Sequence, residues 1–291
     1  MADANGSFIL LMLTMYGISM PFMGWLVSRI PAQKIEERKM TAGQWIIAFL
    51  MCYGLMYAGN LIGTALTFGI GMVKGTGVDN PLVSTVMQLN PWVTFVIAVL
   101  IAPTAEELLF RKLLTERIVK YGELTAVLAS GLFFGLFHRN LNQFSYAFLL
   151  GLFLGFIYVK TGKLRYTIGL HMAINFIGSS LGTWMLRVTG YMDTMETLTE
   201  FLNTKNLEVL ADLGNGIVGM FIFGSYASLI LMMAGAGLIL MWLNRKKFVC
   251  CAPEEKVASL GKKKAAVMIG NPGILLYGAF WIGIMIWQLL Q

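Results

Sequence analysis

The stretch APTAEELLFRK, residues 102–112, places charged side chains inside an otherwise apolar segment. Glu107 and Arg111 are four residues apart, so on a helix they share a face, with the acid N-terminal to the base. We expect these two charges to neutralise each other. Glu106 points about 100° away around the helix and has no such neighbour. The spacing therefore predicts a structural pair, Glu107 with Arg111, and a free carboxylate, Glu106, able to act as a general base.

The chain contains only two histidines, and both fall in apolar segments. His138 ends the stretch FFGLFH, and His171 begins the stretch HMAIN. Asn175 follows His171 by one helical turn, and Phe134 precedes His138 by one turn. Ionisable side chains inside a membrane are costly, so they are functional candidates by default. We therefore take both histidines as candidate site residues.

Two predicted turns bring these residues to a common depth. Glu106 lies sixteen residues before Gly122 and His138 lies sixteen after it, so an antiparallel hairpin would place them level. His171 lies nine residues after a turn at Gly162, which corresponds to about 13 Å along a helix. We expect the three side chains to meet near the ends of the helices that carry basic loops.

The helix that carries the glutamates has a recognisable start and a predicted kink. Asn90 is a suitable N-cap, with Pro91 at the first helical position. Pro103 removes a backbone donor one turn before the glutamates, which predicts a kink there. Small residues in the next two helices predict that these helices approach closely. These pairs are Gly131 with Gly135 and Gly151 with Gly155.

The elements that position these side chains belong to a membrane protein. The chain is 57% apolar and 13% charged over 291 residues, and apolar stretches of spanning length recur along it. Spanning segments must satisfy their backbone hydrogen bonds internally, which favours helices. We predict an all-α fold, a polytopic membrane protein of about eight transmembrane helices, forming one domain over residues 1–291. The predicted helices are roughly 7–28, 45–73, 91–111, 124–138, 144–159, 164–186, 216–243 and 273–290.

The net charge of +7 is distributed unevenly between alternate loops. With eight helices, one set of loops carries seventeen basic residues and the other set carries four. The rich set is Arg29, Lys34, Arg38, Lys39, Lys112, Arg117, Lys120, Lys160, Lys163, Arg165, Arg245, Lys246, Lys247, Lys256, Lys262, Lys263 and Lys264. The poor set is Lys74, Arg139, Arg187 and Lys205. The positive-inside rule predicts a multi-pass cell-membrane protein with the rich loops in the cytoplasm and both termini outside. Such loops indicate topology and contact with anionic lipid in the bilayer, and no nucleic-acid partner.

The longest outer loop, residues 187–215, is acidic and amphipathic. Its apolar residues recur at helical spacing, which predicts a surface helix. They are Met192, Met195, Leu198 and Leu202, and its acidic residues are Asp193, Glu196, Glu200, Glu208 and Asp212.

Three short motifs resemble those of a known family. EELLFR fits the pattern EExxxR, FGLFH fits FxxxH and HMAIN fits HxxxN, in that order. Together they resemble the CAAX prenyl protease and bacteriocin-processing family, also called the ABI or type II CAAX endopeptidase family. The resemblance covers roughly residues 91–180, and the eight-helix plan agrees with it. It uses both histidines of the chain, which makes it more specific than any single motif.

The resemblance implies an intramembrane protease of the glutamate type, with no cofactor. Glu106 with His138 would activate a water, His171 and Asn175 would stabilise the oxyanion, and Glu107 with Arg111 would support the site. Phe134, in the FxxxH motif, would also be a supporting residue. The implied substrate is a membrane-associated peptide or a lipidated protein, cut near the cytoplasmic side. Its identity, and the oligomeric state of the enzyme, are left open.

Other functions use the same residues. Glu106, His138 and His171 form a set of two histidines and one carboxylate that could hold zinc, although the chain has no HExxH motif. The same charges could serve as a proton relay in a proton-coupled transporter, but no repeat-related halves are visible. A third alternative is a non-catalytic protein that binds a membrane peptide, as an immunity factor would.

Overall fold

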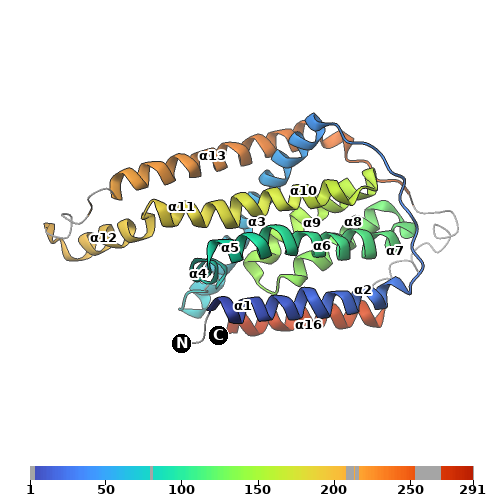
Figure 1. Cartoon of the computed structure of the whole chain (residues 1–291), viewed down its shortest axis with the longest axis horizontal. Helices are drawn as coiled ribbons and strands as arrows, with labels where there is room; N and C mark the ends of the chain where they lie inside the picture. The colour runs from blue at the N-terminus through green and yellow to red at the C-terminus, as the bar shows by residue number, and fades with distance from the viewer. Residues whose placement is uncertain (1–3, 79–80, 208–212, 214–215, 253–269, 291) are drawn as a thin grey trace.

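The computed structural model describes residues 4–78, 81–207, 213, 216–252 and 270–290. The regular structure of these residues is helical, and no strand occurs among them. This confirms the predicted class, an all-α polytopic membrane protein. Most helices run parallel or antiparallel to the long axis of the molecule (Figure 1).

Among the described residues, six helical rods are long and apolar enough to cross a membrane. Two of them combine α-helical segments with π-helical or 3₁₀ segments, which are labelled η. Rod Ala4–Ser28 comprises α1 (Ala4–Met12), η1 (Leu13–Ser19) and α2 (Met20–Ser28). Rod Pro91–Tyr121 comprises α5 (Pro91–Thr94), η2 (Phe95–Ile101), α6 (Ala102–Glu107), η3 (Leu108–Thr115), α7 (Glu116–Ile118) and η4 (Val119–Tyr121). The other four are α3 (Ala42–Lys74), α9 (Leu141–Thr161), α13 (Gly216–Leu243) and α16 (Pro272–Leu290).

The two remaining predicted spans are helical but differ from these six. Helix α8 (Glu123–Phe137) has 15 residues, about 22 Å at 1.5 Å per residue, which is shorter than the hydrocarbon core. The rod 164–188 contains polar residues such as Arg165 and Arg187. It comprises α10 (Leu164–Asn175), η5 (Phe176–Leu181) and α11 (Gly182–Val188). Shorter elements are α4 (Pro81–Gln88), α12 (Tyr191–Thr204) and η7 (Arg245–Lys247).

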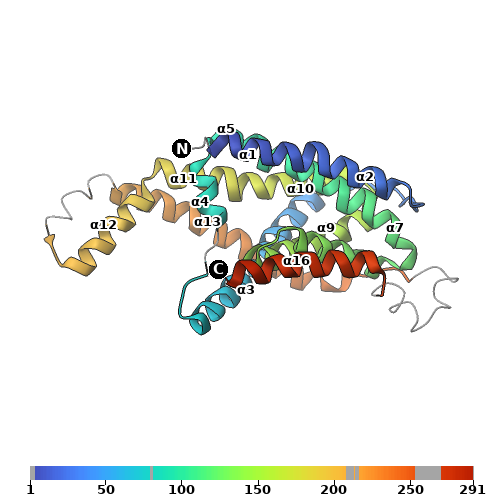
Figure 2. The ribbon, with the colours of Figure 1, turned by 90° about the horizontal axis from the view of Figure 1, so that it is seen from below.

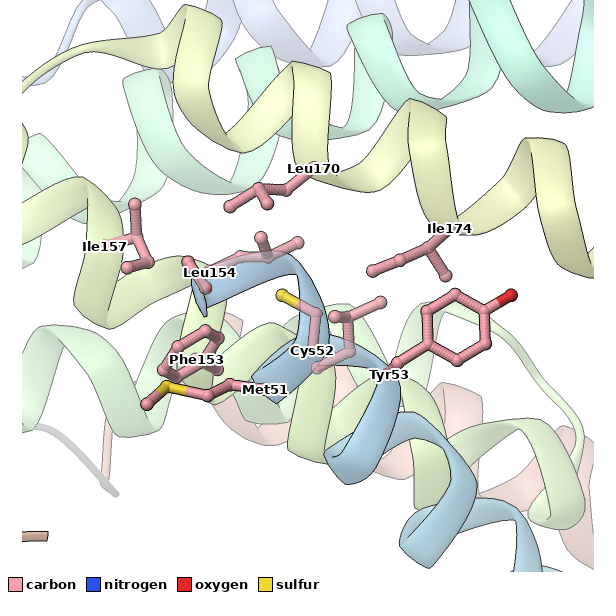
Figure 3. Close-up of a cluster of buried hydrophobic side chains, with 10 residues drawn as sticks. Met51, Cys52, Tyr53, Phe153, Leu154, Ile157, Leu170 and Ile174 are labelled. Carbon is pink, nitrogen blue, oxygen red and sulfur yellow. The ribbon is translucent and has the colours of Figure 1, made fainter. Parts of the chain in front are cut away.

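The main apolar core lies between α3, α9 and α10 (Figure 3). Cys52 of α3, Leu154 of α9 and Leu170 of α10 are completely buried in it. Leu170 and Ile174 of α10 point towards α3 in Figure 3. His171 follows Leu170 directly, so this core fixes the helix from which His171 projects.

Helices α8 and α9 approach closely through glycine, as the sequence predicts. A Cβ on Gly151 would lie 3.0 Å from the Cα of Gly131, and a Cβ on Gly131 would lie 2.6 Å from the Leu152 side chain. Any larger residue at Gly131 would push the two helices apart. This contact holds α8, and therefore Phe134 and His138, against the rest of the bundle.

The basic loops gather at one end of the helices. Three backbone hydrogen bonds connect them there: Gln33 N to Glu116 O (2.7 Å), Arg38 N to Thr161 O (2.8 Å) and Glu123 N to Cys251 O (3.3 Å). Four of the predicted basic residues, Lys256, Lys262, Lys263 and Lys264, lie outside the described residues.

The opposite end carries the beginning of the first rod and the end of the last. Asn5 Oδ1 accepts a hydrogen bond from the backbone of Asn90 (2.7 Å), and Lys74 Nζ donates to the carbonyl of Leu289 (2.6 Å). The two ends of the chain therefore share one end of the bundle, as the even helix count predicts. Which end faces the cytoplasm stays a prediction.

Helix α12 lies far from the helices that carry the predicted site, and Figures 1 and 2 both place it at one extreme of the molecule. Its existence confirms the predicted helix in the acidic loop, and Met192, Met195 and Leu202 are exposed on it. Glu208 and Asp212 of this loop lie outside the described residues. We assign α12 no part in the site.

Candidate active site

The rod that carries the glutamates begins as predicted. Asn90 Oδ1 accepts a hydrogen bond from the backbone of Trp92 (2.9 Å), and Pro91 occupies the first helical position. Pro103 lies in the first turn of α6, which separates two π-helical segments, η2 and η3. Such segments are rare and frequently occur at functional sites. At Pro103, where a kink is predicted, the structure changes from π-helical to α-helical hydrogen bonding, next to both glutamates.

The predicted pair of Glu107 and Arg111 is confirmed, and both side chains are completely buried. Arg111 Nε donates to Glu107 Oε2 (2.9 Å), and Nη2 donates to Oε1 (3.1 Å). Arg111 Nη1 also donates to Ser130 Oγ of α8 (2.7 Å). A buried charge is tolerated only when it is paired and hydrogen-bonded, and this two-point contact meets that requirement.

Phe134 lies at the centre of the candidate site. Its ring is 4.9 Å from the guanidinium carbon of Arg111, within the range of a cation–π interaction. The same ring packs edge-on against His138 and His171, with centroid distances of 4.8 and 5.5 Å. The predicted convergence of the two histidines is therefore confirmed, because both rings contact Phe134.

His171 faces both glutamates of α6 from α10. Its Nδ1 lies 3.1 Å from Glu107 Oε1, and its Nε2 lies 3.9 Å from Glu106 Oε2. An ionised carboxylate oxygen only accepts hydrogen bonds, so Nδ1 carries a proton in this contact. The distance from Nε2 to Glu106 is too long for a direct hydrogen bond. Glu107 thus orients the His171 ring, as carboxylates do for catalytic and metal-binding histidines.

His138 forms the end of α8 and is half buried. Arg139 follows it with a φ of 61°, a left-handed conformation that ends the helix. His138 Nδ1 lies 2.9 Å from the carbonyl oxygen of Phe134. Because a carbonyl only accepts, Nδ1 carries the proton here as well. In the neutral ring, Nε2 of His138 is then the nitrogen with a lone pair available for another contact.

Asn175 occupies the last position of α10, one turn from His171, as predicted. Its Nδ2 donates to the backbone carbonyl of Ala98 in η2 (2.8 Å). This bond connects α10 to the rod that carries the glutamates. An amide nitrogen has two hydrogens, so Asn175 can donate one further hydrogen bond.

Glu106 is not the free carboxylate that the sequence predicts. The hydroxyl of Tyr16, in η1, donates to Glu106 Oε1 at 2.7 Å. The two residues are 90 positions apart, so helical spacing cannot reveal their contact. The sequence signal for this contact is Tyr16 itself, a polar side chain near the middle of the first apolar stretch to which the motifs give no role. Glu106 itself is 6% exposed.

The alternative set of zinc ligands is not arranged as a metal site in the part of the chain that the structure describes. Among those residues, no group of three or more His, Cys, Asp or Glu side chains is arranged so that it could hold a metal ion. Glu106, His138 and His171 therefore do not form such a group. The predicted absence of a cofactor stays a prediction.

A cavity of about 390 Å³ lies beside the site, between α2, η3, α8 and α16. Its walls are mainly apolar, and Arg117 and Lys120 of the basic end contribute to its lining. Phe110 lines the cavity, and its ring lies 5.4 Å from that of Phe134. Ring contacts from Phe110 through Phe134 therefore connect the wall of the cavity to both histidines.

The fold is that of a multi-pass membrane protein, and Glu106, Glu107, Arg111 and His171 are buried among its helices. Residues 88–177 match the family model of the type II CAAX prenyl endopeptidase Rce1-like domain. The predicted resemblance is thereby confirmed for this segment, which covers less than a third of the chain. No curated protein and no solved structure matches the chain.

The matched segment contains every site residue that the sequence predicts. These are Glu106, Glu107, Arg111, Phe134, His138, His171 and Asn175. Tyr16 and α16 lie outside it.

Proposed function

We propose that the chain is an intramembrane endopeptidase in which Glu106 activates the water that cleaves the peptide bond. The position of Glu106 supports this proposal most directly. Tyr16 occupies Oε1, whereas Oε2 faces His171 Nε2 at 3.9 Å. A water can contact two polar atoms that are too far apart to bond directly. Among the described residues, no lysine or arginine pairs with Glu106, whereas Arg111 pairs with Glu107 beside it.

The reaction begins with proton transfer to Glu106. Its carboxylate takes a proton from the water while the water oxygen attacks the carbonyl carbon of the scissile bond. His138 Nε2 accepts a hydrogen bond from the second O–H of that water and orients it, and this hydrogen stays on the attacking oxygen. Glu106 then transfers its proton to the leaving nitrogen, the C–N bond breaks, and a new carboxyl group and a new amine are formed.

His171 and Asn175 stabilise the negative charge that develops on the carbonyl oxygen. Protonated His171 donates from Nε2, and Glu107 balances its positive charge through Nδ1 at 3.1 Å. Asn175 donates its second amide hydrogen, while the first holds it to Ala98. Donors that are already oriented towards a developing oxyanion are usually the largest single contribution to catalysis. No step of this mechanism uses a metal.

The substrate is a membrane-associated peptide or a lipidated protein. The family description refers to prenylated CAAX proteins, and the cavity of about 390 Å³ beside the site has the apolar walls that a lipid or apolar peptide segment requires. By the positive-inside rule, the basic loops face the cytoplasm, so cleavage takes place on the cytoplasmic side of the bilayer.

The test compares two glutamates of the same rod. Purified wild type, Glu106→Gln and Glu116→Gln are reconstituted in liposomes with a farnesylated CAAX peptide or its unlipidated form, and products are identified by mass spectrometry. Glu116 is an appropriate control because it is also 6% exposed and contacts Lys112 and Tyr158. We expect Glu106→Gln to lose a factor of about 10²–10⁴ in turnover and Glu116→Gln to retain it. Full activity of a folded Glu106→Gln variant contradicts the proposal.

A further inference from the structure

The first rod contributes one polar side chain to the candidate site. Tyr16 lies in η1, and its hydroxyl donates to Glu106 Oε1 at 2.7 Å. Among residues 4–28, Met20 is the one that is buried, and the others are partly or fully exposed. A helix with so few protein contacts nevertheless reaches the proposed general base.

One face of this rod makes the contact. Tyr16, Met20 and Met23 follow one another at intervals of four and three residues, so they share a face. Met20 is 6% exposed and packs in one cluster with Phe110 and Phe134, while Tyr16 and Met23 border it. The face that carries Tyr16 is therefore the face that docks on the site.

The direction of the hydrogen bond has a consequence for Glu106. A tyrosine hydroxyl donates one hydrogen, and a carboxylate has two oxygens to accept it. With Oε1 held by Tyr16, the side chain of Glu106 is fixed so that Oε2 faces His171. Without that bond, the carboxylate would be free to rotate about its terminal torsion, which is broad in glutamate.

We propose that Tyr16 is a positioning residue, which holds Glu106 in the orientation that its role as a base requires. The inference rests on the proposed function of Glu106 and extends the site beyond the segment of residues 88–177.

A second pair of the same residue types provides a comparison within the chain. Tyr158 of α9 donates to Glu116 Oε1 at 2.9 Å, in the same rod as Glu106. Lys112 Nζ binds the same oxygen at 2.7 Å, so two donors hold Glu116. In the part of the chain that the structure describes, Glu106 Oε1 receives one hydrogen bond, from the neutral hydroxyl of Tyr16. Tyr158→Phe is therefore the matched control for Tyr16→Phe.

The experiment measures kcat, KM and the unfolding temperature of both variants in detergent with the farnesylated peptide. Tyr16→Phe keeps the ring and removes only the hydroxyl. We expect kcat to fall about 10- to 100-fold, the range for one hydrogen bond to a charged group. KM should stay within about twofold, because the ground-state contacts of the substrate are unchanged. Tyr158→Phe should leave kcat unchanged.

A packing variant separates the hydroxyl from the position of the rod. Met20→Ala loosens the same helix face and keeps the bond from Tyr16 to Glu106. It should lower the unfolding temperature and reduce kcat much less than Tyr16→Phe does. An equal loss of kcat in Met20→Ala would show that packing alone matters and would overturn the inference.

The remaining outcomes are distinct. An unchanged kcat in Tyr16→Phe overturns the positioning role, and an increase shows instead that Tyr16 restrains the base. A raised KM with unchanged kcat makes Tyr16 a substrate contact. These results concern Tyr16 alone if Glu106→Gln is inactive. If Glu106→Gln instead turns over substrate at the wild-type rate, the proposed function itself is contradicted.

Discussion

Two parts of the rod Pro91–Tyr121 hold a buried glutamate beside a tyrosine, and the two glutamates differ in what else surrounds them. Near the middle of the rod, Glu106 receives a hydrogen bond from Tyr16 and faces His171. At the basic end, Glu116 receives hydrogen bonds from Tyr158 and from Lys112. Both glutamates are 6% exposed, so burial does not distinguish them.

The difference lies in the charge of the partners. Lys112 neutralises Glu116, and the pair connects one turn of the rod to α9 through Tyr158. Glu106 has a neutral donor on one oxygen and a histidine beyond hydrogen-bonding distance on the other. Residue type and burial are therefore insufficient to assign a role. A carboxylate is more available for proton transfer when neither of its oxygens is paired with a lysine or arginine.

Glu107 represents the other extreme of this comparison. Two nitrogens of Arg111 and one nitrogen of His171 contact its two oxygens, and none of the carboxylate is exposed. It stands next to Glu106 in sequence but is fully engaged. Adjacent glutamates thus have different environments because they point to different sides of one helix.

The largest expected effect on stability follows from Glu107→Gln. The substitution leaves Arg111 charged and completely buried without its carboxylate, and it removes the group that orients His171. We expect the free energy of unfolding to fall by about 3–5 kcal/mol, the usual consequence of breaking a buried pair. Reversible unfolding in mixed micelles measures this change. A fall no greater than that of Glu116→Gln would contradict the distinction between the two glutamates.

The next prediction concerns Asn175→Ala. Loss of one donor to the oxyanion should lower kcat by about 10²–10³ and change KM little. Asn175→Asp should be at least as damaging, because it places an acceptor where the oxyanion develops.

A matched control is Asn244→Ala. Asn244 also donates from its amide to a backbone carbonyl, that of Leu240 (2.8 Å), but it lies at the end of α13. Its removal should leave kcat unchanged. If the main effect of Asn175→Ala is a higher KM, Asn175 positions the substrate and does not stabilise the oxyanion.

A smaller effect is expected at the basic end. The side chain of Lys112 is 43% exposed, so solvent screens its attraction to Glu116. We expect Lys112→Met to change the free energy of unfolding by about 0–1 kcal/mol, and added salt to reduce that difference further. Unfolding at low and high salt measures it. A loss as large as that of Glu107→Gln would show that the two pairs are equivalent.

The smallest expected effect is that of a chelator. If Glu106 activates water without a metal, ortho-phenanthroline should leave turnover unchanged, once its effect on the micelles is controlled. Neither His138→Ala nor His171→Ala should change the bound metal, although both should abolish activity. One equivalent of zinc that is lost in His138→Ala, together with inhibition reversed by added zinc, would make Glu106 a ligand in place of a base.

The sequence by itself determined the features that depend on one helix. The interval between Glu107 and Arg111 predicts their ion pair, because residues four apart meet on a helix face. Asn90 and Pro91 predict the start of the rod for the same local reason. Recurrent apolar stretches predict the all-α membrane class, and the glycine pairs predict the approach of α8 to α9.

Only the tertiary structure decided which partners come from other helices. Spacing along the chain indicates the depth of a residue but not the neighbour that it faces, since that depends on how the helices pack. Glu106 therefore looked free until Tyr16 was found against it, 90 residues away. His171 could be placed level with the glutamates, yet its bond to Glu107 was decided by the core that holds α10. A carboxylate buried in a membrane protein acquires its role from its contacts, and most of those contacts are made across helices.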